Sequence, residues 1–240
     1  MINSYRKFVI YEMETVLPQI ATNKDFPKTI TNYIIKTDVD ILSADGLYLL
    51  SNIFSEDLFK NIITEELINS LFNSLSIINT ETNSNSFLKM MAKMNKMFEL
   101  ENENIFLKVF KNHDNTILLT ESLIRLLPDK ETRDNKSIMY DVLDFIITII
   151  ENTQMEKMYT NDIESIVRFS ISTLSETYTE EMRVKILKLL YQITKYDEYY
   201  KDSYMKSELI EILEDYKDNN NVEDEAKELA KKVLDNINNH

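Results

Sequence analysis

The residue types that most often carry out chemistry are scarce in this sequence, and their spacing forms no catalytic or metal-binding pattern. There is no cysteine, and of the two histidines His240 is the last residue while His113 falls in a predicted loop. Acidic residues are plentiful, but no Asp-x-Asp-x-Asp-Gly loop and no Glu-x-x-His pair arranges them as metal ligands. The single glycine, Gly46, leaves no glycine-rich phosphate loop. We therefore expect no enzyme activity, no cofactor and no metal site.

The charge of the chain argues against nucleic acid as a partner. The formal net charge is −14, whereas a phosphate-binding surface requires clustered lysine and arginine. Much of the acidic excess lies in residues 197–228, which hold twelve acidic and four basic residues. This stretch predicts either a solvated, self-repelling surface or a docking surface for a basic partner.

The beginning of the chain resembles an amphipathic helix and not a signal peptide. Apolar residues there alternate with Arg6, Lys7, Glu12 and Glu14. No uncharged apolar run is long enough to span a bilayer, and the absence of cysteine favours a reducing compartment. We therefore expect a cytoplasmic protein with no membrane span, and its oligomeric state is left open.

The composition predicts an all-α fold. One glycine and three prolines leave little material for hairpins, and 43% of the residues are hydrophobic, which is enough to fill a core. Periodic apolar patterns predict helices over 1–21, 28–54 with a break near Gly46, 64–75, 87–98, 105–110, 117–127, 138–150, 163–174, 182–193, 207–216 and 222–237. Polar residues predict a loop at 79–86, and charged residues predict another at 129–136.

Two of these predicted helices have distinctive compositions. The helix over 138–150 is apolar all round, so we expect it to be buried on every side with Ile146 and Ile150 at the centre. The helix over 87–98 carries a stripe of methionines on one face and lysines on another. A methionine stripe is typical either of ordinary core packing or of an adaptable binding groove.

Short similar segments recur along the chain and predict a repeat. They are Thr64-Glu-Glu-Leu-Ile, Thr120-Glu-Ser-Leu-Ile and Ser207-Glu-Leu-Ile, and Asn161-Asp-Ile-Glu occupies an equivalent predicted helix start. The steps of roughly 40 to 55 residues are typical of armadillo or HEAT stacking. We therefore predict one domain over residues 1–240 with an armadillo/HEAT-like helical repeat, or α-solenoid. A compact irregular helical bundle is the alternative.

The segment Tyr159-Thr160-Asn161-Asp162 joins the apolar helix to the next one. In a purely structural interpretation, Asn161 is the N-cap with Glu164 three residues later, and Tyr159 is a buried ring that fixes the angle at which the chain enters the helix. In the same interpretation Arg183 pairs with a nearby carboxylate, either Asp162 or Glu180.

The arrangement of this segment between the apolar helix 138–150 and the leucine-rich helix 186–193 resembles the leucine-rich armadillo domain of the WISH/Dip family of Arp2/3-complex activators. The chain keeps Arg183 and Leu187 of the family pattern, has Ile186 where the family usually has tyrosine, and places Tyr199 near the far end. The resemblance covers about residues 104–213, while the amino-terminal part matches only as generic helices.

This resemblance implies a function in the actin cytoskeleton. Proteins of the family bind the Arp2/3 complex and activate it without a preformed filament, so that linear actin filaments are nucleated and actin is engaged only through the complex. It also implies that partner contacts are made by Tyr159, Asn161, Asp162, Arg183 and Lys185. One alternative function is a general helical-repeat adaptor that binds other proteins, and another is an enzyme whose site no recognisable motif marks.

Overall fold

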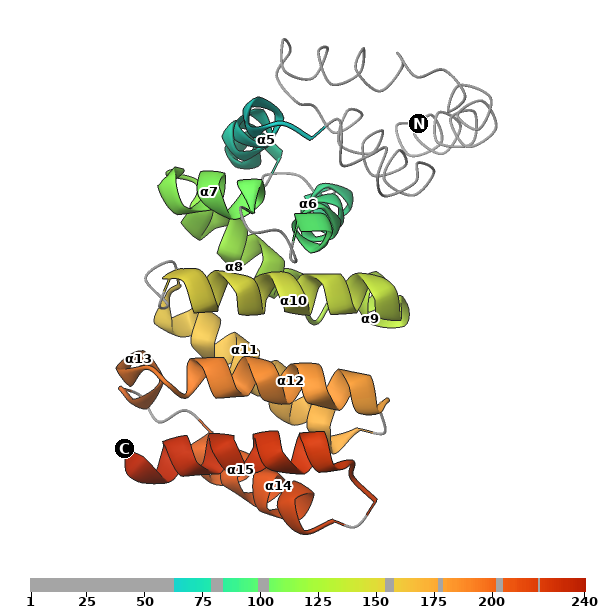
Figure 1. Ribbon diagram of the computed structural model, residues 1–240, viewed down its shortest axis with the longest axis vertical. Coiled ribbons are helices and arrows are strands. Elements are labelled where there is room, and N and C mark those ends of the chain that lie inside the picture. The colour runs from blue at the N-terminus through green and yellow to red at the C-terminus, as the bar shows by residue number, and fades with distance from the viewer. Residues whose placement is uncertain are drawn as a thin grey trace. The chain divides into compact units, whose positions relative to one another are not determined.

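The computed structural model of the protein describes residues 63–78, 84–98, 104–153, 158–176, 179–201, 205–219 and 221–240. These residues form eleven α-helices and no strands, which confirms the predicted all-helical class for the described ranges (Figure 1). The helices are α5 (Glu65–Ile78), α6 (Ser84–Phe98), α7 (Ile105–Asn112), α8 (Thr116–Leu126), α9 (Lys130–Asp134), α10 (Lys136–Thr153), α11 (Thr160–Ser175), α12 (Glu180–Ile193), α13 (Asp197–Tyr200), α14 (Lys206–Asp218) and α15 (Asp224–Asn239). The helices predicted over 1–21 and 28–54, with the break near Gly46, lie outside the described residues, as does most of the predicted loop 79–86.

The chain divides into two compact units, Met1–Leu119 and Thr120–His240, and each is described by itself. In the described part of the first unit, α7 packs against both α5 and α6. The ring of Phe72 on α5 lies 5.7 Å and 6.2 Å, between centroids, from the rings of Phe106 and Phe110 on α7. Helix α5 begins as predicted, because the Thr64 hydroxyl accepts a hydrogen bond from the amide of Leu67 at 3.2 Å. The assignment of all 240 residues to one domain stays a prediction.

The methionine stripe of α6 belongs to the core. Met90, Met91, Met94 and Met97 are all buried, with at most 7% of their surface exposed. These side chains therefore form no open groove, and the core interpretation of the stripe is the correct one. Lys89, expected on the opposite lysine face, is also buried.

In the second unit, α10, α12 and α15 lie side by side, and α11 and α14 lie behind them (Figure 1). Helix α10 packs against α9 and α12, and α12 packs against α15. The prediction for the apolar helix is confirmed at its centre, since Ile146 and Ile150 are both fully buried. It is wrong that every side is buried, because Tyr140, Asp144 and Ile147 are only partly buried. The predicted charged loop at 129–136 is wrong in part, because Asp129 caps the short helix α9 by accepting a hydrogen bond from the amide of Thr132 at 3.0 Å.

The three side-by-side helices bury equivalent positions at a constant interval. Their first residues, Lys136, Glu180 and Asp224, are 44 residues apart in both steps. Four sets of residues follow this interval, and every member is at most 3% exposed: Val142, Ile186 and Ala230; Phe145, Leu189 and Val233; Ile146, Leu190 and Leu234; Ile149, Ile193 and Ile237. The value of 44 residues lies within the predicted range of roughly 40 to 55, but the short similar segments did not mark these three helices. One of those motifs was misplaced, since Thr120 lies inside α8 and is buried there.

Candidate functional site

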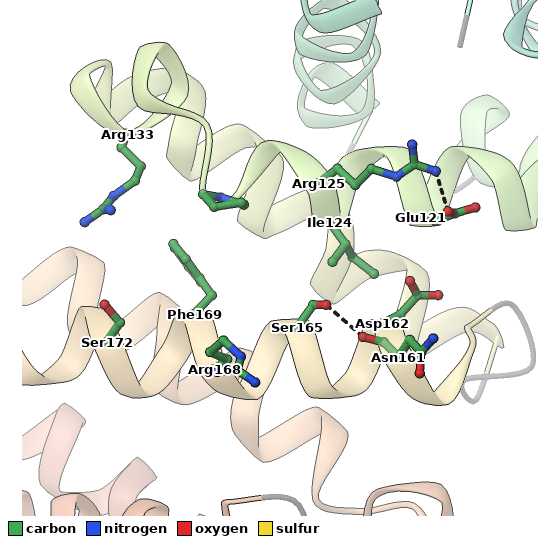
Figure 2. Close-up of a pocket in the computed structure, with 11 residues that line it drawn as sticks. Glu121, Ile124, Arg125, Arg133, Asn161, Asp162, Ser165, Arg168, Phe169 and Ser172 are labelled. Carbon is green, nitrogen blue, oxygen red and sulfur yellow. Dashed lines mark hydrogen bonds and ion pairs between the residues drawn. The ribbon is translucent and has the colours of Figure 1, made fainter. Parts of the chain in front are cut away.

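A cavity of about 530 Å³ opens on the second unit, between the second half of α8, the short helix α9 and α11 (Figure 2). Its apolar part consists of Ile124, Pro128 and Phe169. Its polar part is made by Glu121, Arg125, Arg133, Asn161, Asp162, Ser165, Arg168 and Ser172. We call this cavity the arginine groove.

One face of α11 forms a wall of the arginine groove. Asn161, Ser165, Arg168 and Ser172 follow one another at intervals of four, three and four residues, so they share a face of the helix. The opposite side of α11 carries Ile163, Ile166, Val167 and Leu174, which are buried as their spacing predicted. The same helix therefore packs into the fold with its apolar face and presents a polar face to the groove.

The groove concentrates the arginines of the chain. The sequence contains five arginines, at positions 6, 125, 133, 168 and 183, and three of them line this one cavity. Each of the three lies beside a carboxylate: Arg125 beside Glu121, Arg168 beside Glu164 at 3.1 Å, and Arg133 beside Glu176 at 3.2 Å. These pairs are solvent-accessible, so each contributes little to stability.

Asp162 at the end of the groove is the residue that caps α11. Its carboxylate accepts a hydrogen bond from the amide of Tyr159 at 2.8 Å, and Tyr159 is the N-cap. The predicted N-cap, Asn161, is wrong by two positions and instead lies in the first turn. Asp162 is only 6% exposed, and burial raises the pKa of its carboxyl above the ordinary value.

The ring of Tyr159 is exposed, and the prediction that it is buried is wrong. It is 57% exposed and is the one large hydrophobic side chain found exposed among the described residues. Together with Glu121, Thr160, Asn161 and Asp162 it lines a smaller hollow next to the arginine groove. The Tyr-Thr-Asn-Asp motif thus presents an aromatic ring to solvent in this smaller hollow.

Arg183 and Lys185 lie on α12, and neither lines the arginine groove. The Arg183 guanidinium donates to Glu180 at 2.9 Å, which confirms one of its two predicted partners and not Asp162. The Lys185 ammonium lies 2.5 Å from a carboxylate oxygen of Asp144 on α10. The structure therefore brings together Tyr159, Asn161 and Asp162, whereas Arg183 and Lys185 contact neighbouring helices. Partner binding by all five stays a prediction.

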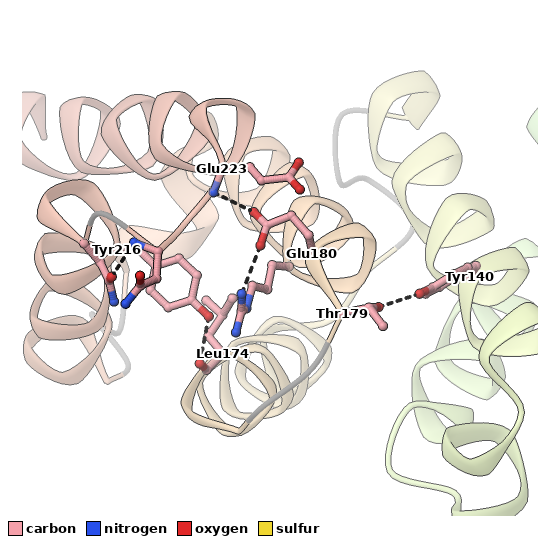
Figure 3. A network of polar contacts seen from close by, with 9 residues as sticks. Tyr140, Leu174, Thr179, Glu180, Tyr216 and Glu223 are labelled. Atoms are coloured by element: carbon pink, nitrogen blue, oxygen red, sulfur yellow. Dashed lines mark hydrogen bonds and ion pairs between the residues drawn. The ribbon is translucent and has the colours of Figure 1, made fainter.

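The polar contacts near Glu180 and Tyr216 join the ends of four helices (Figure 3). Glu180 accepts a hydrogen bond from the amide of Glu223 at 3.3 Å, and Tyr216 on α14 donates to the carbonyl of Leu174 on α11 at 2.9 Å. Thr179 is the N-cap residue of α12, but its hydroxyl is 2.8 Å from the Tyr140 hydroxyl and does not cap an amide. These bonds hold helices together and show no open site.

The described residues show neither a metal-binding cluster nor a membrane-spanning helix. No cluster of three or more histidine, cysteine, aspartate or glutamate side chains is placed to hold a metal ion within the described ranges. None of the helices described is both long and apolar enough to cross a membrane.

No protein-family model matches the chain, and no curated protein matches it in sequence. The resemblance to the WISH/Dip family stays a prediction.

Proposed function

We propose that this chain is a helical-repeat protein of the armadillo or HEAT kind that acts by binding another protein. The constant interval of 44 residues between α10, α12 and α15 supports this architecture. Hydrogen bonds between described residues far apart in sequence support it as well, because they recur at separations of 39 to 43 residues. Such spacing is expected when each unit contacts mainly the next unit along the chain.

The observation that carries the proposal of protein binding is the arginine groove. It combines an apolar lining with exposed arginines, and arginine and aromatic residues are the types enriched where proteins contact each other. Tyr159 adds an exposed ring in the smaller hollow next to the groove. A single exposed ring is ordinary on a protein surface, so Tyr159 supports the proposal only through its place in this hollow.

We propose the Arp2/3 complex as the first partner to test. The proposal rests on the resemblance of the Tyr159-to-Leu190 region to the WISH/Dip family, and the solvent-facing ring in the motif Tyr159-Thr160-Asn161-Asp162 favours it. The protein would then act in the cytoplasm, at the actin cytoskeleton, as an allosteric ligand and not as a catalyst. Such a ligand shifts the complex towards its filament-like arrangement only by binding that arrangement more tightly. A general adaptor function for other proteins is the alternative.

Actin assembly with purified components tests this proposal. In a mixture of actin and Arp2/3 complex that lacks WASP-type proteins and preformed filaments, adding this protein should accelerate polymerisation and produce linear filaments under the microscope. Tyr159→Ala should reduce the acceleration at unchanged helicity, because the ring is exposed and contributes little to the core. Tyr159→Phe, which keeps the ring, is the matched control.

Two results would contradict the proposal in different ways. If the protein binds the complex but polymerisation is no faster than with the complex alone, it is a binding module without activator function. If it does not bind the complex at all, the general adaptor function remains.

A further inference from the structure

The distribution of charge on the second unit is uneven in a way that its net charge does not suggest. The whole chain carries −14, and residues 197–228 alone carry twelve acidic and four basic side chains. Against this background, the arginine groove holds three arginines and two carboxylates, Glu121 and Asp162.

The carboxylates that now pair with the groove arginines are exchangeable. Arg125 and Arg168 are 58% and 63% exposed, and each pairs with a glutamate one helical turn earlier. Solvent-exposed pairs of this kind contribute little to stability. An incoming carboxylate that forms a bidentate bond with the guanidinium can therefore replace or share the resident glutamate at small cost.

The arginines are spread along the groove and do not converge on one point. Figure 2 shows Arg133 towards one end, beside Phe169 and Ser172, and Arg125 towards the other end, beside Glu121, with Arg168 on α11 between them. A single phosphate group requires cations that surround one position. A row of separated arginines instead matches carboxylates that are themselves spaced along a chain.

The lining between the arginines is apolar. Ile124 points from α8 towards α11, and the Phe169 ring rises from α11 (Figure 2). The cavity of about 530 Å³ is large enough to take apolar side chains of a ligand. A ligand that fits both features alternates acidic residues with large apolar ones.

We infer that the arginine groove binds an acidic peptide segment of a partner protein, with carboxylates on Arg125, Arg133 and Arg168 and an apolar side chain against Phe169. This inference rests on the proposed protein-binding function and names the chemistry of the partner. It goes beyond the residues that the family resemblance implied, of which only Asn161 and Asp162 line the groove.

Fluorescence anisotropy with synthetic peptides tests the inference. The probe is a short labelled peptide in which glutamates alternate with leucine and phenylalanine, and its control carries glutamine in place of each glutamate. The acidic peptide should bind at least about 10-fold more tightly than the glutamine peptide. Its affinity should fall when NaCl rises from about 0.05 to about 0.5 M, because salt screens exposed charges.

Variants locate the binding to the groove. The double change Arg125→Gln and Arg168→Gln should weaken binding of the acidic peptide about 10-fold while helicity and Tm stay close to wild type. Lys232→Gln is the matched control, since Lys232 pairs with Glu228 one turn earlier on α15 just as Arg168 pairs with Glu164 on α11. This control should bind the peptide like wild type.

Several results would overturn the inference. Equal binding of the acidic and glutamine peptides excludes charge recognition. If Lys232→Gln weakens binding of the acidic peptide as much as the double arginine variant does, the peptide responds to the overall electrostatic field of the protein and not to the groove. If the double arginine variant abolishes self-association seen by sedimentation, the occupant is a second copy of this chain. If a peptide with a single phosphoserine and no carboxylates binds more tightly than the acidic peptide, the groove is a phosphate site.

The same variants separate this inference from the proposed function. If Arp2/3 complex or another partner binds wild type and the double arginine variant equally, the binding function stands and the groove chemistry fails. If the acidic peptide binds but the complex does not, the groove chemistry stands and the choice of partner fails.

Discussion

Asp162 has two opposing effects on stability, and substitution can separate them. Its carboxylate caps α11 through the amide of Tyr159, yet its charge is buried. Asp162→Ala removes the acceptor and should lower the free energy of unfolding by about 1 kcal/mol. Asp162→Asn keeps an acceptor oxygen and removes the charge. This variant should therefore be more stable than Asp162→Ala and, near neutral pH, more stable than wild type.

The effect of Asp162 should depend on pH with a definite sign. Because burial raises its folded-state pKa above the ordinary value of 3.8, its contribution to stability is present below pH 3.8 and is lost as pH rises through the raised value. The advantage of Asp162→Asn over wild type should therefore grow from acidic to neutral pH. Urea unfolding across this range measures it, and an advantage that does not change with pH would contradict the assignment.

Two buried tyrosines should respond in opposite ways to the same substitution. Tyr216 donates from its hydroxyl to the carbonyl of Leu174, whereas the hydroxyl of Tyr199 is buried with no hydrogen-bond partner among the described residues. Tyr216→Phe should cost about 1 kcal/mol, since it leaves a buried carbonyl without its donor. Tyr199→Phe should cost nothing or stabilise the protein, and it serves as the control for losing a hydroxyl. Equal losses in thermal unfolding would contradict this prediction.

The sequence predicted residue-level burial well where helical spacing decides it and poorly where packing decides it. Ile146 and Ile150 lie on the apolar face of α10, so any packed fold must bury them. Tyr159 lies at a helix entrance, where local sequence does not fix the direction of the ring, and it is exposed. Thr179 is the N-cap residue of α12, but its hydroxyl forms a hydrogen bond with the hydroxyl of Tyr140, which is distant in sequence, and not with a backbone amide.

At the scale of helices, α10 and α12 are joined by a charge pair that is nearly enclosed. The side chains of Lys185 and Asp144 are 16% and 12% exposed, and the Lys185 ammonium also lies 5.4 Å from the centre of the Tyr140 ring. Lys185→Met or Asp144→Leu alone leaves an uncompensated charge and should destabilise the protein on the order of 3 kcal/mol. The double variant should lose less than either single variant, because no charge is then left alone.

Urea unfolding of the two single variants and the double variant forms a complete cycle. The coupling should be absent in a second cycle on Lys188 and Glu225, whose pair between α12 and α15 is 49% and 60% exposed. Additive losses at Lys185 and Asp144 would show that their contact contributes nothing to the packing of the two helices.

The arginine groove shows what the sequence could not reveal at this scale. Arg125, Arg133 and Arg168 lie on three helices, and no local pattern brings positions so far apart into one cavity. Two signals were available in the sequence: the polar stripe of α11, and the fact that three of five arginines lie within residues 125–168. Only the fold, which places α8, α9 and α11 around one cavity, turns these signals into a site.

For the whole molecule, the acidic excess should make stability depend on salt. Like charges repel within a compact fold, and salt screens them with a Debye length of about 10 Å at 0.1 M. The Tm should therefore rise as NaCl is added, at concentrations too low to denature the protein or to salt it out strongly. Glu211→Gln with Asp215→Asn, two exposed acidic positions on α14, should raise the Tm at low salt and reduce its salt dependence. A Tm that falls with NaCl would show that ion pairs outweigh the repulsion.

The interval of 44 residues has a consequence for how the second unit opens. Helix α12 lies between α10 and α15 and contacts both. The pair α14 and α15 can therefore detach while α10 keeps its contacts with α9 and α12. Local opening then requires much less free energy than complete unfolding. Amide hydrogen exchange should show this as a gradient, with slow exchange in the middle of α10 and faster exchange along α15, although both helices are equally well formed.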